Sequence, residues 1–251
     1  MEHDDDGRTD AARQDWRLLN DRLRATLRPF AAPVAITFLP QGEVAPLSRL
    51  DDAYPEPNDQ GRTGQVPAGC VFWVRGATES FATTAPDHAN CSVGGLTHGF
   101  LTVEEAASKD DVCAVLDAGW VDEAAVAGLP RVTDTPGTVL YGPLADTRSD
   151  PDVVLVRVDG LALMTLKDSL PELRIEGKPQ CHIIAIAKEE GTVAASVGCA
   201  LSRARTGMRP EEMTCAIPGH RVAEVVEALE GTVRLNQAMA NYAATDARRF
   251  G

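Results

Sequence analysis

Residues 70–91 read CVFWVRGATESFATTAPDHANC, and residues 181–199 read CHIIAIAKEEGTVAASVGC. Each stretch begins and ends with a cysteine, and in the second the closing cysteine follows a run of small residues. The opening cysteines align at an offset of 111 residues and the closing cysteines at 108. Self-similarity at a nearly constant offset predicts an internal duplication.

The similarity extends outward from these two stretches. PVAITFL at 33–39 matches DVVLVRV at 152–158, and an amphipathic helix is expected to follow each cysteine pair. We therefore expect an α/β or α+β fold of two pseudo-repeated strand-loop-strand-helix halves, about 30–130 and 150–235, packed around a shared seam. The prediction makes residues 11–251 one domain, with an N-terminal helix and C-terminal helices, after a disordered acidic tail at 1–10.

Local patterns assign the remaining elements. Leucines at helical spacing predict a helix within residues 9–30, behind a cap at Thr9 or Asp10. The segments 70–76 and 181–196 are interpreted as strands or a hairpin, and 101–119 as a single helix. The end of the chain is expected to form two helices separated by Gly231. Residues 41–65 are rich in Pro, Gly and Asp, which is typical of a lid or binding loop.

Composition excludes several kinds of partner. The net charge of -13 would repel phosphate backbones and anionic lipids, which disfavours nucleic acid and membrane surfaces as partners. No apolar run approaches the roughly 20 residues of a membrane span. The acidic start MEHDDDGRTD is unlike a secretory signal, so we expect a cytoplasmic protein. A homo-oligomer is left open.

Six cysteines in a cytoplasmic chain favour metal binding or thiol chemistry, because disulfides would be reduced in that compartment. A twofold relation between the halves would bring four thiols together at the seam. These four candidate ligands are Cys70, Cys91, Cys181 and Cys199. We interpret the other two, Cys113 and Cys215, as packing residues.

Thiolate ligands are soft and select iron–sulfur clusters, zinc or cuprous copper. Spacings of 21 and 18 residues within the halves differ from the short C-x2-C knuckles of structural zinc, so a 4Fe-4S cluster is favoured over zinc. If Cys181 is not a ligand, one iron keeps an open position. The glycines beside the cysteines, Gly94, Gly95 and Gly198, would let backbone N–H groups approach the cluster, although turn formation explains them equally well.

Two further side chains are candidates for catalysis. His88 lies three residues before a cysteine and could serve as a fourth ligand or proton donor. Arg203, with Arg205 in SRARTG, could orient an acidic substrate through a bidentate contact. The alternative for the arginines is a structural salt bridge to Glu211 or Glu212.

The chain resembles the family called domain of unknown function 169, or uncharacterised ArCR proteins, over roughly residues 30–230. The resemblance is carried by PVAITFL, AGCVFWVRGA, NCSVGGLTHGF, ASVGCALSRARTGM and EEMTCAIPG. It implies that Cys70, Cys91 and Cys199 belong to a family pattern together with the three glycines. Cys181 matches less well, and the resemblance implies no substrate.

Together these observations predict an iron–sulfur protein that acts as a lyase, sulfur-transfer or redox enzyme on a small acidic or sulfur-containing molecule. Two alternatives stay open. One is a non-catalytic small-ligand module with buried structural cysteines. The other is a metal-free enzyme whose nucleophile is Cys91, activated by His88.

Overall fold

A computed structural model describes residues 14–50 and 69–247. The predicted acidic tail, the Thr9/Asp10 cap and most of the predicted loop at 41–65 lie outside this part of the chain. Within it, seven strands form one sheet in the order β2-β3-β1-β4-β7-β6-β5. The strands are β1 Val34–Pro40, β2 Phe81–Thr83, β3 Pro136–Pro143, β4 Val153–Val158, β5 Arg174–Glu176, β6 Ala194–Ser196 and β7 Met213–Pro218.

The centre of the sheet is the antiparallel pair β1 and β4, in which Val34 lies opposite Leu155. β3 and then β2 continue the sheet beside β1, while β7 and then β6 continue it beside β4. All pairs are antiparallel except β5 with β6. The predicted pseudo-repeat is not confirmed, because β3 lies outside the predicted first half at about 30–130 and β5 has no counterpart beyond β2. Common descent of the two halves stays a prediction.

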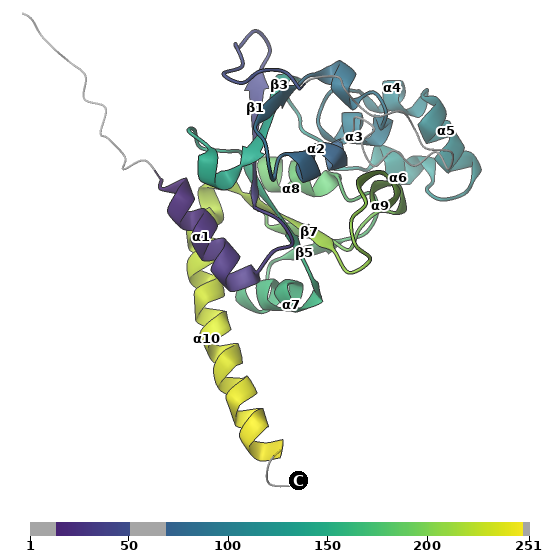
Figure 1. The fold of residues 1–251 in the computed structure, drawn as a ribbon. Helices are drawn as coiled ribbons and strands as arrows, with labels where there is room; N and C mark the ends of the chain where they lie inside the picture. The colour runs from purple at the N-terminus through teal and green to yellow at the C-terminus, as the bar shows by residue number, and fades with distance from the viewer. Residues whose placement is uncertain (1–13, 51–68, 248–251) are drawn as a thin grey trace, which may run out of the picture.

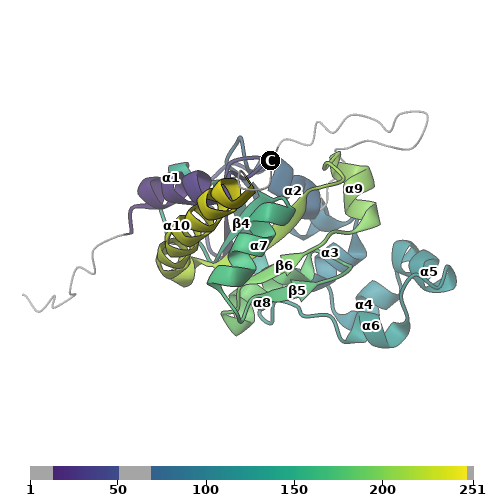
Figure 2. The same ribbon diagram turned by 90° about the horizontal axis from the view of Figure 1, so that it is seen from below.

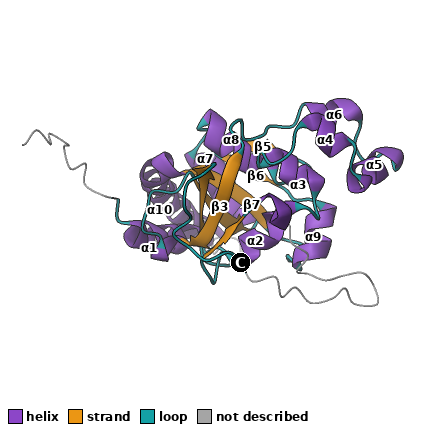
Figure 3. Cartoon of the chain, turned by 90° about the horizontal axis from the view of Figure 1, so that it is seen from above, coloured by secondary structure: helices purple, strands orange, loops and turns teal. Residues whose placement is uncertain are grey.

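Helices cover both faces of the sheet, so the fold is mixed α/β (Figure 1; Figure 3). α1 (Trp16–Leu27), α7 (Gly160–Ser169) and α10 (Val222–Ala247) pack on one face. α2 (Gly69–Arg75) and α8 (His182–Glu190) pack on the other, and α3 (Ser92–Thr97) and α9 (Ala200–Thr206) lie beside them. Between the layers the β4 side chains alternate: Val154 and Val156 face the first set of helices, and Leu155 faces the second.

The N-terminal helix α1 forms as its leucine spacing predicts. Leu19, Leu23 and Leu27 are buried on one side, and the Asp15 carboxylate accepts a hydrogen bond from the Leu18 N–H at 3.0 Å. Burial of each leucine contributes about 1.5–3 kcal/mol before conformational entropy is subtracted. The helix therefore covers part of the sheet face on which α7 and α10 also pack.

Two segments predicted as strands are helices. α2 occupies the first of them, and α8 occupies most of the second, with only Ala194–Ser196 forming a strand. Every residue from 182 to 187 is buried, so the apolar run carries no amphipathic period that would separate helix from strand. Gly191, with φ +62°, ends α8 in the left-handed conformation.

Two other boundaries differ from the prediction. The expected helix at 101–119 is two short helices, α4 (Val103–Ala107) and α5 (Asp110–Asp117), followed by α6 (Glu123–Ala127). These three helices form a group at the edge of the molecule, away from α1 and α10 (Figure 2). At the other end, Gly231 does not interrupt α10, which is one continuous helix of 26 residues. None of the helices in residues 14–50 and 69–247 combines the length and apolar character of a membrane crossing.

Candidate functional site

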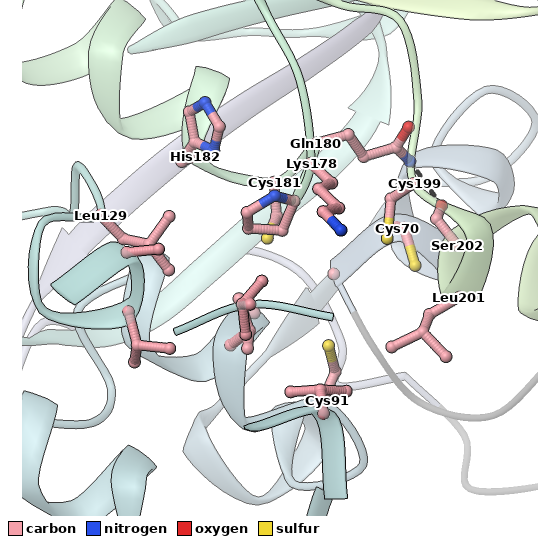
Figure 4. A pocket seen from close by; sticks show the side chains of 18 of the residues that line it. Cys70, Cys91, Leu129, Lys178, Gln180, Cys181, His182, Cys199, Leu201 and Ser202 are labelled. Atoms are coloured by element: carbon pink, nitrogen blue, oxygen red, sulfur yellow. Dashed lines mark hydrogen bonds between the residues drawn. The ribbon is translucent and has the colours of Figure 1, made fainter. Parts of the chain in front are cut away.

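Four of the six cysteines lie at the N-terminal ends of four different helices. Cys91, Cys181 and Cys199 directly precede α3, α8 and α9, and Cys70 is the second residue of α2. All four line one cavity of about 350 Å³. Figure 4 shows their side chains reaching it from separate elements. The structure therefore brings together the four thiols that the sequence singled out.

The remaining two cysteines lie elsewhere. Cys215 on β7 faces the α1, α7 and α10 side of the sheet and is fully buried there. It is a packing residue, as expected. Cys113 on α5 is exposed rather than packed, because the helix that carries it is short and only its Val112 face is buried. These two cysteines are natural controls for the four in the cavity.

Burial raises the pKa of Cys70, Cys91 and Cys181. It raises the pKa of Cys70 to about 11, with a hydrogen bond to Ser202 acting in the opposite direction. The pKa of Cys181 is raised well above its ordinary value, first by burial and then by the charges that Cys91, Cys199 and Cys70 would carry as thiolates. Four thiolates in this cavity would repel one another, so a cationic centre is needed to hold them deprotonated.

Polar groups contact three of the cavity sulfurs. Cys70 interacts with Ser202, and Cys181 with Thr97. Cys91 has two partners, the Gly94 backbone N–H and the Arg205 guanidinium. Such contacts stabilise a thiolate ligand and tune the metal centre that it holds.

Arg205 supplies positive charge at the thiol end of the cavity. It lies close enough to Cys91 and Cys70 for their negative charge to raise its pKa, although burial acts to lower it. Asp111 on α5 contributes to the same effect, and its carboxylate accepts a hydrogen bond from the Ser92 N–H at 2.9 Å. That bond fixes α5 against the start of α3, beside Cys91.

Arg203, the arginine predicted to orient a substrate, is absent from the cavity lining. Its guanidinium donates hydrogen bonds to the backbone carbonyls of Val197 at 3.1 Å and of Glu212 at 2.6 Å. These hydrogen bonds connect the segment before α9 to the segment after it. Among the described residues, Arg203 forms no salt bridge to Glu211 or Glu212, the predicted alternative, and the Glu212 carboxylate accepts from Arg157 at 2.9 Å instead.

The His88 side chain also lies outside the cavity lining. It is 1% exposed, its Nε2 lies 3.1 Å from the Thr83 hydroxyl, and its ring centre is 4.9 Å from that of Phe72. Burial and the neighbouring His98 hold its pKa well below the ordinary value. The lowered pKa makes His88 a weak proton acceptor, and the side-chain contacts described above join it to Thr83 and Phe72 rather than to Cys91.

The three predicted glycines have different surroundings. A Cβ on Gly94 would lie 3.5 Å from the Cys91 sulfur, so this glycine faces the site. A Cβ on Gly95 would instead meet Leu101 at 3.1 Å. Gly198 has φ +118°, and a Cβ there would lie 2.8 Å from the Arg203 guanidinium. Gly95 and Gly198 therefore serve local packing and turn geometry.

The sequence pattern missed several residues of the site. Ser202 lies three residues after Cys199, a helical spacing that would have placed it beside that cysteine had α9 been expected to be a helix. Gln180, 2% exposed, donates a hydrogen bond from its amide to Ser202 (Figure 4). His182 lines the cavity too, and its Nε2 lies 3.2 Å from a Glu176 oxygen.

Beyond the thiols the cavity has an apolar wall. The side chains that form it come mainly from α5, α6 and the segments next to them. They are Val93, Val115, Val121, Val126, Leu129, Pro130 and Leu201, with Trp120. Lys178 lies at the rim, with its amine 4.4 Å from the centre of the Trp120 ring. The cavity can thus hold a small molecule beside the sulfur atoms.

Among residues 14–50 and 69–247, no group of three or more His, Cys, Asp or Glu side chains is placed to hold a metal ion. Metal centres differ in how far apart they hold their ligands. A tetrahedral ion with metal–sulfur bonds of about 2.3 Å would draw its sulfurs to within about 4 Å of one another. A polynuclear cluster holds its ligands further apart, because each cysteine binds a different metal atom.

The fold and the cavity define a mixed α/β protein with a buried four-thiol site. The family model for domain of unknown function 169, uncharacterised ArCR, matches residues 22–228, and the chain belongs to this family. No curated protein and no solved structure matches the chain.

Proposed function

We propose that the protein binds an iron–sulfur cluster in the four-thiol cavity and uses it as an enzyme. Cys70, Cys91 and Cys199 are the ligands, and Cys181 is either the fourth ligand or lies beside an open iron. The observation that carries the proposal is the convergence of four cysteines, from four helices and both halves of the chain, on one cavity.

The chemistry of the donor set supports a cluster. The four sulfur ligands are soft, which suits iron–sulfur clusters, zinc or cuprous copper. The cysteine spacings of 21 and 18 residues within the two stretches differ from the short C-x2-C knuckles of structural zinc, which favours a cluster over zinc. The helix N-termini at the four cysteines add positive potential, which would stabilise thiolates in an otherwise costly buried position.

An open iron would supply Lewis acidity for binding a sulfur or oxygen atom of a substrate. The chain's own residues would orient that substrate and exclude water. The apolar wall restricts access of solvent, while Arg205 places a guanidinium near Cys91 and Cys70. Because Arg203 is engaged with backbone carbonyls, Arg205 takes over the proposed role of binding an acidic group. A small acidic or sulfur-containing substrate fits these surroundings.

A cytoplasmic location accords with this proposal. None of the six cysteines, all of them within the described residues, is in a disulfide. Thiols that must remain reduced until a cluster is inserted are favoured in a reducing compartment.

Anaerobic purification of the full chain tests the cluster directly. We expect a brown protein that absorbs near 400 nm and contains equal amounts of iron and inorganic sulfide. Serine at position 70, 91 or 199 should reduce the iron content at least severalfold, whereas Cys113→Ser and Cys215→Ser should leave it unchanged.

The Cys181→Ser variant decides the fourth ligand. Retained iron with an altered electron paramagnetic resonance spectrum would identify an open site, and loss of iron would identify a ligand. A colourless wild-type protein that binds no iron after anaerobic reconstitution would refute the proposal. It would favour a ligand-binding module with structural cysteines.

A further inference from the structure

The outer part of α10, residues 233–247, projects away from the body of the protein (Figure 1). The first part of the helix is anchored, because Val222, Val225, Val226 and Leu229 are completely buried against α1, α7 and the sheet. From residue 234 onward, the side chains are mostly exposed. About 14 residues at 1.5 Å per residue give a free helix of about 21 Å.

This free segment carries its own apolar stripe. Leu235, Met239 and Tyr242 are 69%, 63% and 63% exposed, and their spacing of four and three residues places them on one side of the helix. At about 100° per residue, the stripe is rotated by roughly 120° from the buried side of the first part. The exposed stripe is therefore not a continuation of the surface that packs on the body.

We propose that this outer stripe pairs antiparallel with the same stripe of a second copy of the chain, forming a twofold dimer. In such a pair with its axis level with residue 240, Tyr242 lies opposite Ala238 of the other copy, and the same contact occurs twice. The bulky ring thus meets a small residue that lies on the same side of the helix. A twofold contact of this kind is self-complementary.

The charge distribution favours a second copy of the chain as the partner of the outer stripe, and an antiparallel arrangement of the two helices. Between Gly231 and Ala247 the sequence has only two charged residues, Arg234 and Asp246, whereas the chain as a whole carries -13. An antiparallel pair keeps two strongly acidic bodies at opposite ends of the paired helices, beyond the screening length of about 8 Å. A parallel pair would place them next to each other. The scarcity of basic residues also disfavours an anionic membrane as the occupant.

Sedimentation velocity of the full chain tests the pairing. We expect the wild type to reach twice the 26.7 kDa chain mass at micromolar concentrations. The double variant Leu235→Glu/Tyr242→Glu should raise the dissociation constant by roughly 100-fold or more. Leu161→Glu, at a 68% exposed position on α7, is the matched control and should leave it unchanged. Circular dichroism confirms that each variant is folded.

Disulfide trapping in a Cys113→Ser background tests the direction. Met239→Cys should cross-link two chains, because position 239 lies near the proposed axis. Gln237→Cys, on the opposite side of the helix, should not. Leu235→Cys should not cross-link either, since an antiparallel pair separates the two copies of residue 235. A wild type that stays monomeric at 100 µM, a double variant that dimerises normally, or efficient cross-linking at 235 would each overturn the proposal.

Discussion

The buried thiols of the cavity should react far more slowly than the exposed Cys113 in metal-free, reduced protein. Burial raises the pKa of Cys70 to about 11, so at pH 7.5 only about three molecules in ten thousand carry this thiolate. An ordinary exposed thiol with a pKa of about 8.5 is about one-tenth ionised at that pH. Ionisation alone therefore predicts that Cys70 is alkylated about 300-fold more slowly than an ordinary exposed thiol.

The more basic thiolate is intrinsically a better nucleophile by about tenfold, which reduces the expected difference to about 20- to 30-fold. Restricted access to the cavity slows Cys70 further. The measurement is a time course with iodoacetamide, in which peptide mass spectrometry follows each cysteine separately. The Cys70 rate should also rise about tenfold per pH unit up to about pH 11.

Two controls are built into the experiment. In guanidinium chloride all six cysteines should react at similar rates, because the difference arises from the folded environment. Cys215, whose pKa burial raises to about 12, should be slow for the same reason although it lies outside the cavity. If Cys70 or Cys91 reacts faster than Cys113 at pH 7.5, the cavity holds an activated nucleophile. The reasoning from burial would then be wrong.

Three further predictions concern stability, measured by urea unfolding of the metal-free protein. The Cys70 thiol stays protonated in the folded state up to about pH 11, whereas it ionises above about pH 8.5 in the unfolded chain. Its contribution to the free energy of unfolding is therefore complete below about pH 8.5 and is lost at about 1.4 kcal/mol per pH unit as pH rises toward 11. Cys70→Ala should remove this part of the loss of stability at alkaline pH. Glu212→Ala leaves the Arg157 guanidinium, whose side chain is 14% exposed, without its carboxylate and should cost about 3–5 kcal/mol, and an unchanged midpoint would contradict the pairing. Gly219→Ala would place a Cβ 1.8 Å from the Pro151 carbonyl oxygen and should destabilise by more than about 2 kcal/mol, whereas Gly177→Ala, with open space around it, should not.

Much of the fold could be predicted from local pattern. The sequences of β1, β4 and β7 are alternating or continuous apolar runs bounded by turn residues. In α1, leucines at helical spacing form one apolar side. α2 and α8 could not be assigned in this way, because burial on nearly every side removes the periodicity that distinguishes a helix from a strand. For α8, Lys188 in the last turn and Gly191 after it form a helix-ending pattern that would have corrected the assignment.

The sequence predicted the four cysteines of the candidate site but not most of the residues around them. The matched cysteine positions predicted that four thiols lie together, and all four line one cavity, while the pseudo-repeat behind that inference stays a prediction. The choice of Arg203 over Arg205 depended on which side of α9 faces the cavity, and the sequence alone does not give this; in the structure Arg205 lines the cavity and Arg203 does not. His88 was chosen for closeness in sequence, but the turn before Cys91 directs its ring into the aromatic interior.

The central claim is that the four thiols hold one iron–sulfur centre, and Mössbauer spectroscopy of protein reconstituted with ⁵⁷Fe tests it most directly. We expect sulfur-coordinated, exchange-coupled iron in the wild type and in Cys215→Ser, and its disappearance in Cys70→Ser/Cys199→Ser. Retention of the same spectrum in that double variant, or only mononuclear iron bound through oxygen and nitrogen in the wild type, would contradict the claim.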